Sequence, residues 1–212
     1  MFLPDIRFHR SGIVPMTMAP SKPADDANFI VRSGALVNLQ KHQPQDESSF
    51  VRWYTDADIA WVLRHDLRPL TPYQASGYFT TIVMPSSAHG TAWGIHDNES
   101  NTLIGTTAIT EIDERHGECL FRIVIGEKAV WNRGFGTDAT RLVVAEAFDR
   151  FDLGAVNLEV FEHNPRAYRS YEKVGFREQH RTEEWARNVR LEVIAMRLRR
   201  EDWDETYHCV AH

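Results

Sequence analysis

The chain has 212 residues, of which 42% are hydrophobic and 25% charged, with a formal net charge of −6. This length fits a single domain with a sizeable core, and the acidic balance argues against a general nucleic-acid binder. No apolar run approaches the ~20 residues of a membrane span, and the two cysteines lack metal-binding spacing, so we expect a cytoplasmic protein that binds neither a membrane nor a metal.

Three regions are predicted along the chain. Residues 1–32 contain the stretch MAPSKPADDAN, which has little to bury, so they are predicted to form a mobile N-terminal extension. Residues 33–204 are predicted to form the single domain, and residues 205–212 a C-terminal tail.

The domain begins with one strand and two helices in this interpretation. Residues 35–40 alternate between apolar and polar and predict a strand. Helices are predicted over 46–64 and 71–84. The second has a capping-box pattern at Thr71 and Gln74, with a proline at the first helical position.

A three-stranded meander follows, and then the hydrophobic period changes. The three segments have hairpin spacing, and they are TAWGIHD, LIGTTAITEID and ECLFRIVIGE. Val144, Ala147, Phe148 and Phe151 then form one stripe of a helix. The remaining predicted elements are a strand over 155–161, a helix over 165–174 that Gly175 ends, and two strands within 177–200.

The least ordinary stretch is WNRGFGTDATR, in which two glycines directly precede a predicted helix. Glycine costs conformational entropy there, but it lets an anion approach the free N–H groups and the positive dipole end of the helix. The stretch therefore predicts a phosphate-binding loop. Residues 134–139 also match the dinucleotide fingerprint of some oxidoreductases. That alternative is weaker, because EKAVWN separates the glycines from the preceding strand.

A second motif, NPRAYRSYEKVGF, lies one strand and one helix after the glycine loop. Together, W-N-R-G-F-G-T-D-A and N-P-R-A-x-x-x-Y-E-K-V-G-F resemble the cofactor-binding and C-terminal motifs of the GNAT superfamily of acyl-CoA-dependent N-acyltransferases. The branch that includes the ribosomal-protein N-terminal acetyltransferases is the most similar. Trp131 departs from the pattern, because the family usually has Gln or Arg at that place.

The resemblance implies an α+β fold with a mixed, mostly antiparallel sheet flanked by helices, in the order β-α-α-β-β-β-α-β-α-β-β. It also implies acetyl-CoA as cosubstrate, with its diphosphate on the loop and its pantetheine arm in a gap between two splayed strands. The implied cofactor-binding residues are Val124 and Ile125 through their backbones, and Arg133, Gly134, Phe135, Gly136, Thr137 and Asn164. Asn164 has a second interpretation as a helix N-cap, and the two roles are compatible.

The resemblance also indicates a proton donor. Tyr171 matches the family's tyrosine that protonates the leaving sulfur, although its helical spacing also fits a core residue. The general base is less clear, because Leu120 occupies the place that we align with the family's usual Glu. Glu118, Glu111 and His116 are nearby alternatives, and each is also compatible with a solvated hairpin position.

These observations predict an N-acetyltransferase that transfers an acetyl group directly to a primary amine of a small molecule or a protein N-terminus. The alternative is a catalytically silent acyl-CoA-binding regulatory module. A homodimer is left open.

Overall fold

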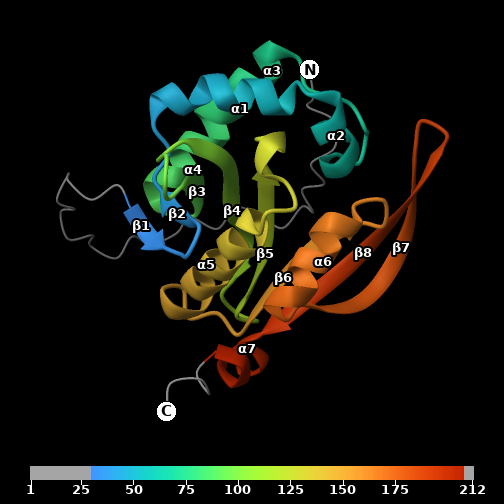
Figure 1. Cartoon of the computed structure of the whole chain (residues 1–212). Coiled ribbons are helices and arrows are strands. Elements are labelled where there is room, and N and C mark those ends of the chain that lie inside the picture. Colours follow the sequence, from blue (N-terminus) through green and yellow to red (C-terminus); the bar gives the residue numbers. More distant parts are fainter. Residues whose placement is uncertain (1–29, 208–212) are drawn as a thin grey trace.

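The computed structural model describes residues 30–207, so most of the predicted N-terminal extension and the last five residues lie outside the described part (Figure 1). An eight-stranded sheet runs through the molecule in the order β1-β2-β3-β4-β5-β6-β8-β7. Its strands are β1 (Ile30–Ser33), β2 (Val37–Gln40), β3 (Ala92–Asp97), β4 (Leu103–Asp113), β5 (Glu118–Ile125), β6 (Ala155–Phe161), β7 (Arg177–Ala186) and β8 (Val189–Arg199). The predicted α+β fold with a mostly antiparallel sheet is confirmed, since β5 and β6 form the one parallel pair among the described strands.

Helices occupy both faces of this sheet. They are α1 (Glu47–Tyr54), α2 (Ala57–Leu63), α3 (Pro72–Tyr78), α4 (Met84–His89), α5 (Phe135–Asp149), α6 (Pro165–Val174) and α7 (Arg200–Tyr207), with short helical turns η1 (Pro44–Asp46), η2 (Phe79–Val83) and η3 (Lys128–Val130). The side chains of β5 alternate between the faces: Phe121 joins the main core with α5 and α6, whereas Val124 packs with Trp53 of α1 and Ile59 of α2. The sheet is therefore buried on both sides at β5.

Two predicted helices have different bounds in the structure. The segment 46–64 is broken at Thr55, because the Asp56 side chain accepts hydrogen bonds from the N–H groups of Asp58 and Ile59 and so caps a new helix. The segment 71–84 starts with the predicted capping box at Thr71, but it continues to His89 through the π-helical turn η2.

The domain boundaries also extend beyond the prediction. The sequence predicts residues 30–32 as part of the extension, but in the structure they belong to β1, which pairs antiparallel with β2. Arg32 anchors this strand, because its Nε donates to Glu146 of α5 at 2.7 Å. At the other end, α7 reaches Tyr207 and includes the first residues of the predicted tail.

The parallel pair β5–β6 is short. Only Glu118, Cys119 and Leu120 of β5 are paired with β6, opposite Ala155, Val156 and Asn157. Beyond these positions both strands continue without pairing to each other, β5 to Ile125 and β6 to Phe161. The sheet therefore opens into a V between β5 and β6 (Figure 1). The closed end of this V is the Leu120–Asn157 pair.

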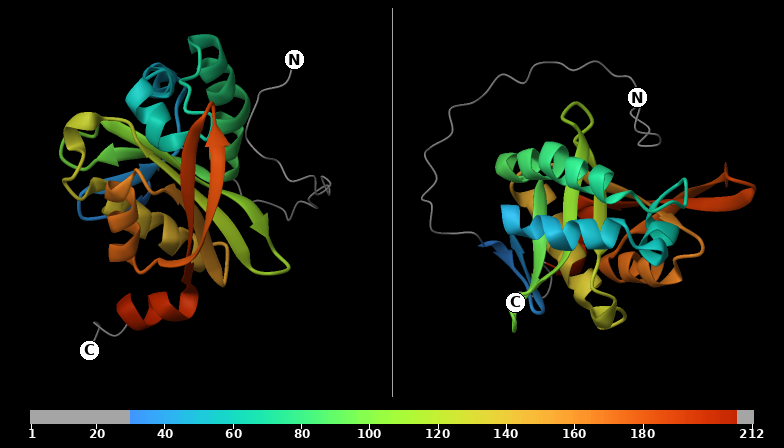
Figure 2. Two further views of the ribbon diagram at one scale, coloured as in Figure 1. Left: turned by 90° about the vertical axis from the view of Figure 1, so that its right-hand side faces the viewer. Right: turned by 90° about the horizontal axis from the view of Figure 1, so that it is seen from above.

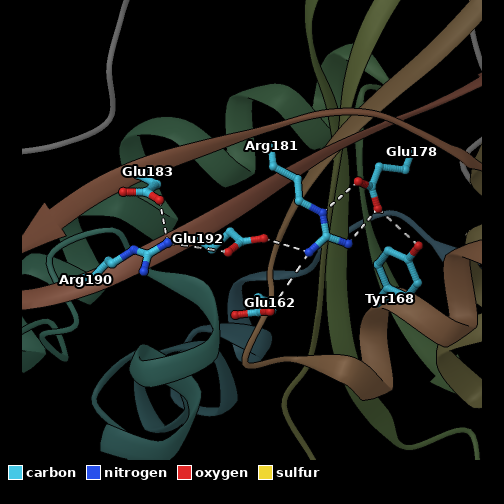
Figure 3. A network of polar contacts seen from close by, with 7 residues as sticks. All are labelled: Glu162, Tyr168, Glu178, Arg181, Glu183, Arg190 and Glu192. Atoms are coloured by element: carbon cyan, nitrogen blue, oxygen red, sulfur yellow. Dashed lines mark hydrogen bonds and ion pairs between the residues drawn. The ribbon is translucent and has the colours of Figure 1, made fainter.

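The β7–β8 hairpin projects well beyond the other strands (Figure 2). Its strand β7 is the edge of the sheet and is exposed along most of its length. Arg181 of β7 pairs with Glu178 and with Glu192 of β8 inside the hairpin, and it lies 3.9 Å from Glu162 of the loop after β6 (Figure 3). The hairpin is held beside β6 by the antiparallel pairing of β8 with the whole length of β6.

Candidate active site

The glycine loop forms the start of α5. Gly134 is the N-cap residue, and its φ of 91° is a left-handed conformation that glycine adopts without strain. The N–H groups of Phe135, Gly136 and Thr137 have no hydrogen-bond partner in the described part of the chain, and no side chain caps the helix. This helix start can therefore bind an anion, as the sequence predicts.

The packing around Gly136 does not explain why this position is a glycine. A Cβ atom there would meet only Ile125 Cγ1, at an ordinary contact distance of 3.5 Å. Glycine has a lower helix propensity than alanine, so the protein's own fold would favour a side chain at this position. A ligand that approaches the backbone at this point would account for the absence of one.

Two guanidinium groups next to the loop have no carboxylate partner among the described residues. Arg133 lies over the ring of Phe135, with its Cζ 5.6 Å from the ring centroid. Arg166 of α6 lies over the ring of Trp131 at 3.6 Å, and burial lowers its pKa without removing its charge at neutral pH. Both cations can therefore pair with a phosphate at this end of α5.

Trp131 also fixes the end of β5, because its Nε1 donates to the Ile125 carbonyl at 2.7 Å. Strand alternation decides which backbone groups of β5 face the V. Thr107 of β4 donates its hydroxyl hydrogen to the Arg122 carbonyl, so the peptide groups of Arg122 and Val124 point toward β4. Those of Ile123 and Ile125 point into the V. A pantetheine arm in the V would therefore face the peptide groups of Ile123 instead of those of Val124, which the sequence predicted. At Ile125 it would face a free N–H, because the carbonyl accepts from Trp131.

Tyr171 is a residue of α6, and its side chain lies in the main core and is 8% exposed. Its ring contacts those of Phe121 and Phe176, and its hydroxyl has no hydrogen-bond partner in residues 30–203. Burial raises the pKa of Tyr171, and the nearby charge of Arg166 partly opposes this shift. The side chain is thus both a core residue and a hydroxyl that keeps its proton until an acceptor comes close.

Asn164 caps α6, because its side-chain oxygen accepts from the Ala167 N–H at 3.3 Å. The amide nitrogen of the same side chain lies 3.5 Å from the Val62 carbonyl of α2. The N-cap interpretation is confirmed, and contact with pantetheine stays a prediction. The contact with Val62 places the end of α2 beside the loop that follows β6.

The three predicted base candidates lie together at the closed end of the V. Glu118, Glu111 and His116 line one cavity of about 250 Å³, which also touches the last paired residues, Leu120 and Asn157. These three side chains differ in their hydrogen-bond partners and in their exposure to solvent. Glu118 accepts from Nη2 and Nη1 of Arg197 at 2.8 and 3.0 Å and from the side-chain amide of Asn157, and the Arg197 contact lowers the pKa of Glu118.

The other two candidates are more exposed. His116 is paired with Asp113 in the β4–β5 turn at 2.8 Å, and this contact raises the pKa of His116. Glu111 lies 3.7 Å from Arg122, with its side chain 61% exposed. Neither these two nor Glu118 lies along the unpaired part of β5 or β6.

A carboxylate on the unpaired part of β6 is better placed and was missed in the sequence. Val156, Leu158 and Val160 face the main core, so Glu159 faces the opposite side, just beyond the closed end of the V. Its side chain is half-exposed, and its Oε2 lies 3.9 Å from Nε2 of His65. Its position as a charged residue between apolar strand neighbours was a usable signal.

His65 belongs to the loop after α2, and the sequence gave no indication of its role. Its Nδ1 lies 2.7 Å from Glu184 of β7, and its ring meets Phe161 of β6 edge-on at 5.0 Å. Three segments that are distant in sequence therefore converge on the open side of the V.

Comparison with known proteins agrees with this geometry. A model of the acetyltransferase (GNAT) domain matches residues 37–177, which is more than half of the chain. The chain belongs to the GNAT family of acetyltransferases.

One curated relative is the uncharacterized N-acetyltransferase YoaA of Bacillus subtilis, which is 28% identical over 93 residues; the match covers 42% of this chain and half of that relative. The fold is shared with a GNAT-family acetyltransferase from Bacillus anthracis, with a TM-score of 0.69, 15% identity and coverage of 82% of this chain and 99% of the other. It is also shared with spermidine N-acetyltransferase from Vibrio cholerae, solved in complex with CoA and spermine, with a TM-score of 0.67, 18% identity and coverage of 79% and 97%.

No helix within 30–207 is long and apolar enough to cross a membrane. No group of three or more His, Cys, Asp or Glu side chains in the described part of the chain is arranged to hold a metal ion.

Proposed function

We propose that this protein transfers an acetyl group from acetyl-CoA directly to a primary amine of a small molecule or a protein N-terminus. The observation that carries the proposal is the V between β5 and β6, with an anion-binding helix start at its open end and Tyr171 beside its closed end. Family membership supports an acyltransferase, while the donor and the acceptor are our inference.

The dimensions of the V fit the pantetheine arm of CoA. The arm has roughly as many chain bonds as four extended residues, which is about 14 Å. The four residue-to-residue steps along β5 from Ile125 back to Phe121 span about 13 Å. An arm laid along β5 from the glycine loop would therefore end near Phe121, the residue against which Tyr171 packs.

When bound, acetyl-CoA supplies a thioester that an amine can attack. The protein's residues then manage two protons. We assign the removal of the ammonium proton to Glu159, because it is the carboxylate on the unpaired part of β6. We assign to Tyr171 the transfer of a proton to the departing sulfur, since its raised pKa keeps the phenol protonated.

Turnover with a panel of amines tests the proposal. The purified protein is incubated with acetyl-CoA and either spermidine, simple alkylamines or peptides with free N-termini, and the release of free thiol is followed. Spermidine is included because one structural neighbour is a spermidine N-acetyltransferase. Thiol release that depends on an amine supports the function.

The same experiment examines the silent-module alternative. That alternative predicts CoA binding, measured by calorimetry, without turnover on any amine. Failure to bind CoA at all would contradict both interpretations.

A further inference from the structure

His65 joins two carboxylates on the open side of the V. One is Glu184 of β7, whose Oε2 lies 2.7 Å from His65 Nδ1. The other is Glu159 of β6, whose Oε2 lies 3.9 Å from His65 Nε2. The imidazole is thus held between a strand of the proposed site and a strand at the edge of the sheet.

The short contact with Glu184 determines which nitrogen of the ring carries the hydrogen when the ring is neutral. An ionised carboxylate only accepts hydrogen bonds, so a 2.7 Å contact requires the hydrogen on Nδ1. A neutral ring then has its lone pair on Nε2, the nitrogen that faces Glu159. The arrangement therefore orients a proton acceptor toward the carboxylate at the V.

The local packing holds this orientation. The His65 ring meets Phe161 edge-on at 5.0 Å. The neighbouring charges of the same loop, Arg64 and Asp66, are paired with each other through bonds of 2.9 and 3.0 Å. Glu184 is half-buried, whereas Glu183 beside it is exposed and paired with Arg190 (Figure 3).

From this geometry we infer that His65 is a proton relay, which takes from Glu159 the proton that Glu159 removes from the acceptor amine. This inference rests on the proposed function. In the first transfer the amine N–H bond breaks and a Glu159 O–H bond forms. In the second, that O–H bond breaks and an N–H bond forms at His65 Nε2, which restores the Glu159 carboxylate.

Glu184 has a separate role in this step. After the second transfer the imidazole carries a positive charge, and the Glu184 carboxylate at Nδ1 stabilises it. The side chain of His65 is 33% exposed, so the proton can pass from Nε2 to water. Glu184 is a positioning residue that acts through His65.

Kinetics of three variants test the relay with the best acceptor from the amine panel. His65→Ala is expected to lower kcat by about tenfold, because Glu159 must then release its proton directly to water, while acceptor KM and CoA affinity stay unchanged. Imidazole added to the buffer is expected to restore kcat of this variant in proportion to its concentration. Glu184→Gln should lower kcat several-fold, and the matched control Glu183→Gln should leave kcat unchanged.

A second measurement does not depend on activity. Nitrogen-15 chemical shifts of His65 in the intact protein report which ring nitrogen carries the hydrogen, and the relay requires the Nδ1–H form. An Nε2–H form, or a kcat that is insensitive to His65→Ala, or a loss that imidazole does not restore, would overturn the inference. Wild-type protein that acetylates no amine would instead remove the proposed function itself.

Discussion

The ring of Tyr171 meets the ring of Phe121 edge-on, with their centroids 6.2 Å apart and an angle of 83° between the planes. Phe121 is the first residue of β5 beyond its pairing with β6. The proposed proton donor is therefore fixed by core packing at the point where the two strands separate, and the same packing raises the pKa of its hydroxyl.

Removing this hydroxyl tests its role directly. Tyr171→Phe keeps the ring contacts, so we expect kcat to fall by roughly 10²-fold while CoA affinity stays the same. Steady-state kinetics and calorimetry measure the two quantities. Tyr168→Phe is the matched control, because the Tyr168 hydroxyl donates to Glu178 at 3.3 Å on the surface of the molecule. Equal activity of both variants would show that Tyr171 is only a core residue.

The pH dependence of the wild type gives a related expectation. Because burial raises the pKa of Tyr171, its phenol stays protonated well above its ordinary value of about 10. We therefore expect kcat to show no decline up to about pH 10. A decline whose midpoint moves when Tyr171 is changed to phenylalanine would contradict this expectation.

The glycine loop can be tested at Gly136. An alanine fits the protein itself, since its Cβ would meet only Ile125 at 3.5 Å, whereas an aspartate adds bulk and negative charge where a phosphate would bind. Gly136→Asp should weaken CoA binding by more than about tenfold, or 1.4 kcal/mol, with Gly136→Ala between it and wild type. Gly77→Ala is the control, because nothing lies within 4 Å of its Cβ in α3. Unchanged calorimetric affinity in a folded Gly136→Asp protein would exclude this loop as the CoA site.

The proposed base can be separated from the earlier candidates by amide substitutions. We expect Glu159→Gln to lower kcat/KM by more than tenfold, and Glu111→Gln and His116→Gln to cost less than about tenfold, because only Glu159 lies on the unpaired part of a V strand. The measurement is acetyl transfer to a single amine at constant pH. If Glu111→Gln or His116→Gln has the larger effect, the cavity at the closed end holds the base.

Glu118 is expected to act on stability more than on catalysis. The hydrogen bonds from Arg197 hold the pKa of Glu118 below its usual range, so its stabilising effect is complete above the unfolded value of about 4.3 and is lost as the pH falls through the lower folded value. Wild type should therefore be more stable than Glu118→Gln at pH 7, and the difference should shrink below about pH 4. Urea unfolding at a series of pH values measures it.

The control for this comparison is Glu111→Gln. Glu111 is exposed, and its contact with Arg122 is a loose surface ion pair of 3.7 Å. Its substitution should therefore change the free energy of unfolding little at any pH. A Glu118→Gln variant as stable as wild type at pH 7 would show that the Glu118–Arg197 contact does not stabilise the fold.

Much of the fold could be predicted because its signals are local. Alternation marks β3 to β6, and Asn164 and Gly175 mark the two ends of α6. Strand β1 was missed because it is a four-residue edge strand with no buried side chain. The break at Asp56 was missed although an N-cap residue was present, because the apolar pattern continues across it.

The candidate site also contains residues that a short motif indicates and residues that only the folded structure brings together. The glycine loop and Tyr171 lie within short motifs, so their spacing indicates their roles. The convergence of His65 and Glu184 joins residues 119 positions apart, and no spacing in the sequence indicates which loop histidine meets which strand carboxylate. Tertiary packing alone brings them together.

The short pairing of β5 with β6 has a consequence for how the chain folds. On one side of the V the strands from β1 to β5 are antiparallel neighbours, and on the other side β7 pairs with β8 through a tight turn. The β3–β4, β4–β5 and β7–β8 hairpins form from contacts close in sequence, whereas the parallel pair joins Glu118 to Ala155 and must wait until α5 has crossed over between β5 and β6. Pairing of β5 with β6 is thus expected as a late event in folding. Weakening the Glu118–Arg197 ion pair should therefore accelerate unfolding while leaving the folding rate nearly unchanged.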